Sequence, residues 1–124
     1  MNIVDSSGWL EYFADGPNAN FFTPVIENIS NLIISSINIY EVFKRVFQQC
    51  DENDAIQSIA IMKQGLVVDL NPMIAISAAK ISVELKLPMA DSIILATARV
   101  YNATLWTQDS DFKSIEGVRY IEKR

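Results

Sequence analysis

The sequence contains no histidine among its 124 residues, and this absence narrows its chemistry more than any residue that is present. Ser-His-Asp and Cys-His catalysis, histidine acid–base pairs and histidine-bearing zinc sites all need an imidazole. These classes of site are therefore excluded. Any chemistry must use carboxylates, hydroxyls, lysine or arginine, with or without a metal ion.

Cysteine, glycine and proline are also scarce. Cys50 is the only cysteine, so no internal disulfide forms, which favours a reducing cytoplasm. The 4 glycines and 4 prolines fall at the edges of predicted elements, and no linker or internal repeat divides the chain. Its length and 50% apolar content predict one globular domain over residues 1–124.

A membrane segment and a strongly basic surface are missing as well. No basic signal-like head precedes the first apolar run, and the apolar stretch 93–100 is interrupted by Thr97 and Arg99, so we expect a cytoplasmic protein with no membrane span. The net charge of −5 argues against unassisted nucleic-acid binding, unless bound cations offset part of it. Candidate phosphate contacts, with solvated helix faces as the alternative, are Lys44, Arg45, Lys80, Lys86 and Arg99.

Short apolar runs alternate with helical spacing along the whole chain. Strands are predicted at 2–5, 31–35, 66–70, 104–107 and 118–122. Helices are predicted at 9–13, 19–28 with Pro24 as a candidate break, 37–49, 51–62, 72–85 and 89–101, with a loop or single turn at 109–114. Most strands are continuously apolar, which is typical of a parallel sheet covered on both faces. The pattern predicts an α/β fold, a three-layer α/β/α sandwich with a mainly parallel sheet of four or five strands.

Four carboxylates lie near the points where predicted elements change: Asp5, Asp91 and Asp109 lie where a strand or turn gives way to a helix, and Glu41 lies early in a helix that follows a strand. Each has a simple alternative role, because an acid at such a place caps a helix or turn or lies on a solvated face. In a parallel sheet, however, these handovers gather at the carboxyl edge of the strands, where ligands bind. Carboxylates held close together repel one another and need a proton or a cation between them. Oxygen ligands of this kind favour Mg²⁺ or Mn²⁺.

In order and spacing, four segments resemble the PIN-domain nucleases, and among them the small VapC-like toxins of toxin–antitoxin pairs: 3–7 (IVDSS), 39–42 (IYEV), 89–96 (MADSIILA) and 105–112 (LWTQDSDF). The resemblance covers nearly the whole chain. It implies an endoribonuclease that depends on Mg²⁺ or Mn²⁺. Asp5, Asp91 and Asp109 would hold one or two ions, and Glu41 would be a further ligand or would orient or deprotonate the attacking water.

Hydroxyls and a fifth acid would support this predicted site. Thr107 matches a supporting hydroxyl position of the family, and Asp111 matches its variable acidic neighbour. Ser6 is a further supporting residue, for which helix capping is the expected role, as it is for Ser7. None of these hydroxyls is expected to act as a nucleophile, because no histidine is present to activate it.

The resemblance also implies partners: an RNA substrate, a cognate antitoxin protein and a second copy in a homodimer. The aromatic N-terminal region around Trp9, Tyr12, Phe13, Phe21 and Phe22 would offer a partner surface if its rings were exposed. Two alternatives stay open at this point. One is a PIN nuclease of RNA processing that has no antitoxin, and the other is a non-catalytic α/β binding module.

Overall fold

In the computed structural model, which describes residues 1–124, five short strands form one fully parallel sheet in the order β3-β2-β1-β4-β5. The strands are β1 (Asn2–Val4), β2 (Leu32–Ser35), β3 (Leu66–Val68), β4 (Thr104–Thr107) and β5 (Val118–Tyr120). The predicted α/β class and parallel sheet are confirmed, with five strands rather than four. β1 lies at the centre, and the chain continues from it to neighbours on both sides. Such a reversal of strand order is where open α/β sheets bind ligands.

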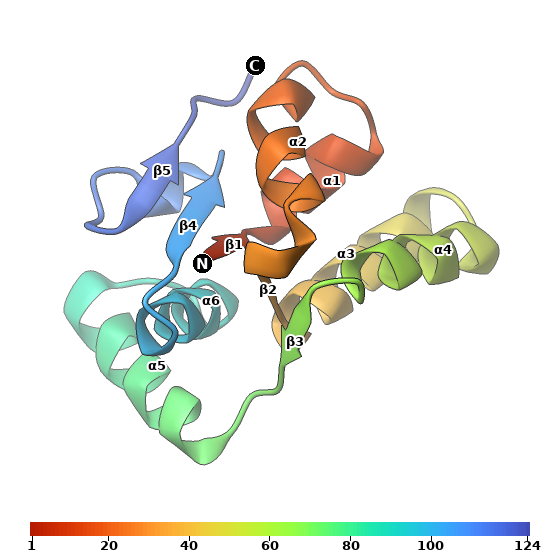
Figure 1. The fold of residues 1–124 in the computed structure, drawn as a ribbon. Helices are drawn as coiled ribbons and strands as arrows, with labels where there is room; N and C mark the ends of the chain where they lie inside the picture. The colour runs from red at the N-terminus through yellow and green to blue at the C-terminus, as the bar shows by residue number, and fades with distance from the viewer.

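Six helices cover the two faces of the sheet (Figure 1). They are α1 (Ser6–Phe13), α2 (Ala19–Glu27), α3 (Ser36–Gln49), α4 (Glu52–Met62), α5 (Pro72–Leu85) and α6 (Met89–Val100). Two single turns, η1 (Ile29–Asn31) and η2 (Ser110–Phe112), complete the chain, and the second confirms the turn expected near residues 109–114. The predicted three-layer sandwich is therefore present.

The alternating directions of successive side chains along β2 explain why its first three residues are all apolar. Ile33 points into a core cluster with α5 and α6, whereas Leu32 and Ile34 point into a second cluster with α1 to α4. All three side chains are at most 2% exposed. Successive side chains of a strand face opposite sides, so a strand covered on both faces needs an apolar residue at every position.

Helix α1 begins three residues before the predicted start at Trp9. Asp5 has extended backbone angles at the N-cap position, and the helix starts directly at Ser6. Gly8 permits this because a Cβ there would lie 2.6 Å from atoms of both Val4 and Phe22. The early start brings Ser6 and Ser7 into the first helical turn, next to the end of β1.

Pro24 does not break α2, contrary to the candidate break in the sequence pattern. The helix runs from Ala19 to Glu27 with the proline inside it. A proline in a helix frees the carbonyl four residues earlier, which here belongs to Asn20, and because Asn20 is exposed this carbonyl is accessible to solvent. The neighbouring Thr23 hydroxyl donates to the Ala19 carbonyl at 2.9 Å and adds a local bond.

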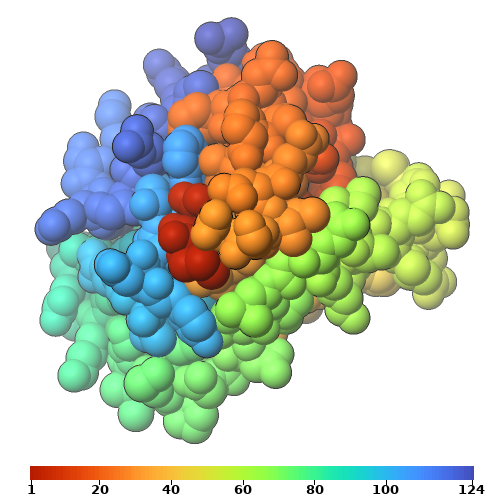
Figure 2. All heavy atoms as spheres, in the orientation of Figure 1, coloured from red at the N-terminus to blue at the C-terminus, as the bar shows by residue number.

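Figure 2 shows the α3–α4 hairpin, coloured yellow to yellow-green, standing out from the body of the molecule. Its outer surface carries apolar side chains that remain exposed, with Phe47 and Ile56 each at 54%. No helix in the structure has both the length and the apolar character needed to cross a bilayer.

Candidate active site

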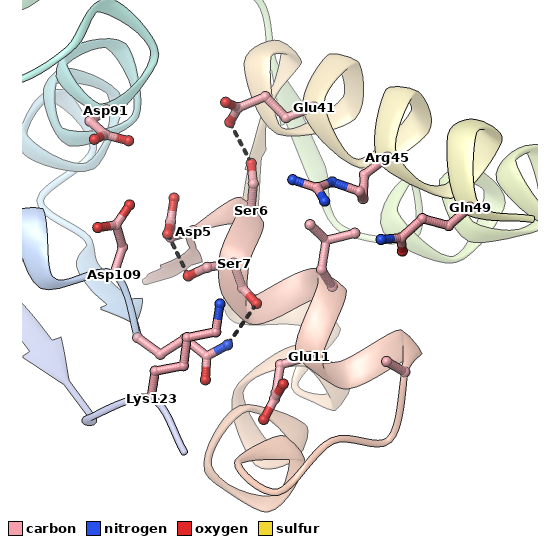
Figure 3. A pocket seen from close by; sticks show the side chains of 13 residues that line it. Asp5, Ser6, Ser7, Glu11, Glu41, Arg45, Gln49, Asp91, Asp109 and Lys123 are labelled. Carbon is pink, nitrogen blue, oxygen red and sulfur yellow. Dashed lines mark hydrogen bonds between the residues drawn. The ribbon is translucent and has the colours of Figure 1, made fainter.

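The four predicted acids line one cavity of about 400 Å³. Asp5 directly follows β1 and Asp109 follows β4, so the parallel pairing of these two strands brings both to the same edge of the sheet. Glu41 lies in α3 after β2, and Asp91 lies in the first turn of α6. Figure 3 shows these carboxylates around the first turn of α1. We refer to this space as the central cavity.

Asp5 is held by two hydroxyls. Its Oδ2 atom accepts hydrogen bonds from Ser7 Oγ at 2.7 Å and from Thr107 Oγ1 at 3.0 Å. Thr107 Oγ1 also accepts the backbone N–H of Asp109 at 2.9 Å. Thr107 is fully buried, so its single hydroxyl joins two of the predicted acids with no competition from water. Capping is therefore not the role of Asp5 or Ser7, and α1 has no side-chain cap.

Glu41 is held from another direction. Its Oε1 atom accepts the Ser6 hydroxyl at 2.7 Å, and Ser6 Oγ accepts the Asn38 side-chain amide at 3.0 Å. Asn38 is 0% exposed, and its Oδ1 atom accepts the Ser35 backbone N–H at the start of α3. The expected capping role of Ser6 is therefore wrong. The sequence analysis did not identify Asn38, because from the sequence alone it is an ordinary polar residue of an amphipathic helix.

Burial and mutual repulsion favour protonation of two of the acids. Burial raises the pKa of Asp5 to about 6, against the opposing effect of the Ser7 and Thr107 hydrogen bonds, and the Asp109 and Glu41 charges raise it further. Burial and then the charges of Asp5 and Asp109 raise the pKa of Asp91 to about 8, with a further contribution from Asp111. A divalent cation would take the place of such protons and satisfy the same carboxylates.

The tightest acidic group is not the predicted quartet. Asp91, Asp109 and Asp111 each offer a carboxylate oxygen, and these atoms lie within 4.8 Å of one another. Asp109 is the N-cap residue of the η2 turn, and its Oδ1 atom accepts the Asp111 N–H at 2.9 Å. The turn therefore places Asp111 close to Asp91 and Asp109. Asp111 was predicted only as a supporting residue. Its proximity depends on the local turn, which residue spacing alone does not reveal.

These donors fit a small hard cation. Two oxygen ligands of a Mg²⁺ ion bound at roughly 2.1 Å lie at most about 4.2 Å apart, so an existing spread of 4.8 Å needs only a small contraction. The set consists of carboxylate oxygens without nitrogen or sulfur, which favours Mg²⁺ or Mn²⁺ over zinc. Asp5 and Glu41 lie outside this group but line the same cavity. Both hydroxyls that bind Asp5 donate to its Oδ2 atom, so Oδ1 has no hydroxyl partner.

Among the predicted phosphate contacts, the structure separates two groups. Arg45 lines the central cavity and Lys44 lines an adjoining one, whereas Lys80, Lys86 and Arg99 line neither. Lys123, which the sequence analysis did not single out, also lines the central cavity. The N-terminal aromatic region is largely internal, since Trp9 and Phe22 are 0% exposed and Phe21 packs against Trp106. Trp9 and Phe22 therefore cannot belong to the exposed partner surface that was considered, whereas Phe13 is half-buried and lines a separate cavity.

Residues 3–118 match the family model of the PIN domain, so the chain belongs to the PIN-domain family. A sequence comparison with curated proteins finds no match.

Solved structures with the same fold include a toxin–antitoxin complex from Klebsiella pneumoniae, 24% identical with a TM-score of 0.83, covering 99% of this chain and 100% of that one. DNA-bound VapBC from Salmonella typhimurium is 20% identical with a TM-score of 0.76, covering 98% of both chains. VapC20 from Mycobacterium tuberculosis, a toxin that cleaves the sarcin–ricin loop, is 16% identical with a TM-score of 0.76, covering 100% of this chain and 99% of that one. At these identities the likeness shows the fold.

Proposed function

We propose that this chain is a divalent-metal-dependent endoribonuclease that acts as the toxin of a toxin–antitoxin pair. The observation that carries the proposal is the meeting of Asp5, Glu41, Asp91 and Asp109 in one cavity of a PIN-domain chain that has no histidine. A carboxylate-only site fits phosphodiester hydrolysis assisted by a hard cation. The PIN-domain match argues against a non-catalytic binding module, and the likeness to structures of toxin–antitoxin complexes favours a toxin over a PIN nuclease of RNA processing.

The residues divide the proposed work between them. Asp91, Asp109 and Asp111 would hold Mg²⁺ or Mn²⁺, together with the Oδ1 atom of Asp5. When bound, the ion supplies Lewis acidity that offsets negative charge on the phosphate oxygens. Ser7 and Thr107 fix Asp5 so that only one of its oxygens remains for the ion.

Glu41 is the proposed general base. Ser6 occupies its Oε1 atom, which leaves Oε2 to orient the attacking water and take its proton. In-line attack by water on the phosphorus breaks the bond to the 3′ oxygen. The products would carry a 5′-phosphate and a 3′-hydroxyl, unlike those of enzymes that use the ribose 2′-hydroxyl.

Two apolar surfaces support the proposed protein partners. A cavity of about 360 Å³ between α1, α3 and α4 is lined by Leu10, Phe13, Val46 and Ile61 and shares Leu10 with the central cavity. An antitoxin segment bound there would reach the acids. On α5, Met73, Ile76 and Val83 recur at helical spacing and are 60%, 62% and 80% exposed, which supports a homodimer interface.

Incubation of the purified protein with total tRNA and rRNA tests the activity. We expect cleavage with Mn²⁺, none with EDTA, and recovery when Mn²⁺ is restored, with 5′-phosphate ends found by fragment mapping. Cleavage that persists in EDTA, or fragments with 2′,3′-cyclic phosphate ends, would contradict the proposed mechanism. Co-expression with the product of a small neighbouring reading frame, followed by co-purification, tests the antitoxin.

A further inference from the structure

Two side cavities continue the central cavity in different directions. The first, of about 350 Å³, shares Ser6, Glu41 and Arg45 with it and adds Tyr40, Lys44 and Gln48 on α3. The second, of about 460 Å³, shares Ser7, Asp109 and Lys123 with it and adds Ser110, Tyr120 and Glu122 near the C-terminus. We call them the α3 cavity and the C-terminal cavity. The three together form one groove that runs across the carboxyl edge of the sheet.

The cations of this groove lie on opposite sides of the central cavity: Arg45 is shared with the α3 cavity, and Lys123 is shared with the C-terminal cavity. Lys44 and Arg45 are the cations that line the α3 cavity, and Lys123 is the cation that lines the C-terminal cavity. The acids lie at the junction, with Glu41 next to the α3 arm and Asp109 next to the C-terminal arm. A polyanion crossing the groove would therefore meet cations before and after the acids.

The cations of both arms are available to a ligand. Arg45, Lys44 and Lys123 are all exposed. In Figure 3, Arg45 extends from α3 and Lys123 from the C-terminal segment, with the first turn of α1 between them, and no hydrogen bond joins either to another residue drawn. Unpaired cations beside an acidic centre are suited to neutralising phosphates on both sides of the reacting one.

The shape and lining of the arms fit an unpaired strand. Asp5 is 3% exposed, so a phosphate must enter the groove to approach the acids, which a single strand does more readily than a duplex. Tyr40 is 61% exposed at the α3 arm and offers a ring for base stacking, with Lys44 Nζ 5.7 Å from its centroid.

We propose that a single-stranded RNA lies along the groove, with Arg45 and Lys123 contacting backbone phosphates on opposite sides of the scissile phosphate and Tyr40 stacking on a base in the α3 arm. This inference rests on the proposed nuclease function and adds the path of the substrate. In this proposal Arg45 and Lys123 position the RNA by contacting its phosphates, whatever the base sequence. Each of the two residues contacts the RNA on one side of the cleavage site.

The test uses a fluorescently labelled single-stranded RNA centred on a cleavage site mapped in the tRNA and rRNA digest. Two shorter RNAs lack the nucleotides on its 5′ side or its 3′ side. Binding is measured by anisotropy on the Asp91→Asn background, so that the RNA stays intact. Arg45→Gln and Lys123→Gln remove one charge each, and Lys80→Gln on α5 is the matched control outside the groove.

We expect Arg45→Gln and Lys123→Gln each to weaken binding of the full RNA by about fivefold to tenfold. Each should lower the slope of log affinity against log salt by about 0.7, the value for one lost phosphate contact on a single strand. With one truncated RNA, Arg45→Gln should no longer weaken binding, and with the other truncated RNA, Lys123→Gln should no longer weaken it. Lys80→Gln should leave the affinity unchanged for all three RNAs.

The proposed path would be overturned if Arg45→Gln and Lys123→Gln weakened binding no more than Lys80→Gln does. It would also be overturned if the same truncated RNA removed the effect of both variants. If unaltered protein still cleaves the RNA with Mn²⁺ in that case, the nuclease function stands without this inference. Absence of any Mn²⁺-dependent cleavage would overturn both.

Discussion

The side-chain amide of Asn38 donates to Ser6 Oγ at 3.0 Å, and this contact decides where the serine proton points. With its oxygen accepting from Asn38, Ser6 directs its only proton to Glu41. The amide cannot flip, because its Oδ1 atom accepts the Ser35 N–H at 3.2 Å. A buried residue on the first turn of α3 thus fixes a carboxylate one turn later.

Asn38→Leu, which roughly keeps the side-chain volume, should lower kcat for RNA cleavage by about tenfold and leave KM nearly unchanged, because Glu41 loses its fixed orientation. Ser35→Ala is the control, since it removes the helix cap at a cost of about 1 kcal/mol but leaves Ser6 and Glu41 joined. In a double-mutant cycle, Asn38→Leu should add little to Ser6→Ala. Additive losses would show that Asn38 acts apart from Ser6.

Asp5→Asn and Asp91→Asn should each abolish RNA cleavage, by about 1,000-fold or more, because each removes a proposed cation ligand. The far-UV circular dichroism should stay unchanged, and the melting temperature of the metal-free protein should stay near wild type or rise, since mutual repulsion is relieved. Retained activity in either variant would refute the assignment of the acids.

The metal-free protein should become less stable as the pH rises from about 4 to about 8. The folded-state pKa of Asp5 is raised from 3.8 to about 6 and that of Asp91 to about 8, so the folded chain binds more protons than the unfolded chain across this window. The free energy of unfolding therefore falls with pH, by about 3 kcal/mol from Asp5 alone. Urea titrations in EDTA measure this, and a flat profile for wild type would contradict it.

Thr107→Val should impair both stability and cleavage although it is nearly isosteric. It removes the donor to Asp5 and leaves the Asp109 N–H without its partner, at a cost of about 1–3 kcal/mol. It should also raise the pKa of Asp5, because the Thr107 bond lowers it. Thr97→Val is the matched control, a buried threonine of α6 bonded only to the Ile93 carbonyl. If Thr107→Val and Thr97→Val lost the same fraction of activity, the effect of Thr107→Val would be explained by lost stability alone.

Asp111→Asn should raise the Mn²⁺ concentration that gives half-maximal cleavage by about tenfold, because one oxygen of the tightest acidic group loses its charge. The exposed Asp69, whose carboxylate accepts the Ser36 hydroxyl, provides Asp69→Asn as a control with no expected change. An unchanged Mn²⁺ requirement in Asp111→Asn would exclude Asp111 from the cation site. Calorimetric Mn²⁺ titration checks the affinity without RNA.

Local chemistry in the sequence was sufficient to place most elements. The pair Asn71–Pro72 predicts the start of α5 because the Asn71 side chain accepts the Ile74 N–H and proline suits the first helical position. The start of α1 was missed because Ser6-Ser7-Gly8 has the composition of a turn. Only the packing of Gly8 against Phe22 shows that the helix already passes there.

For the site, the meeting of Asp5 and Asp109 followed from their places after two strands of a parallel sheet, since the ends of such strands share an edge. Glu41 and Asp91 lie in helices, and their places in the site were expected from the family resemblance. Their supporting contacts did not follow. Asn38 meets Ser6 across 32 positions of sequence, and Lys123 reaches the cavity from the far end of the chain. Such contacts depend on the angles at which helices and tails pack, which no short motif encodes.

The hydrogen bond between Thr107 and Asp5 spans 102 positions of the sequence. During synthesis, Asp5 has no assembled pocket around it until β4 has left the ribosome and paired with β1. The acids can therefore meet only after the 102 positions that separate Asp5 from Thr107 have been made, and a fragment that ends before Thr107 has no assembled pocket.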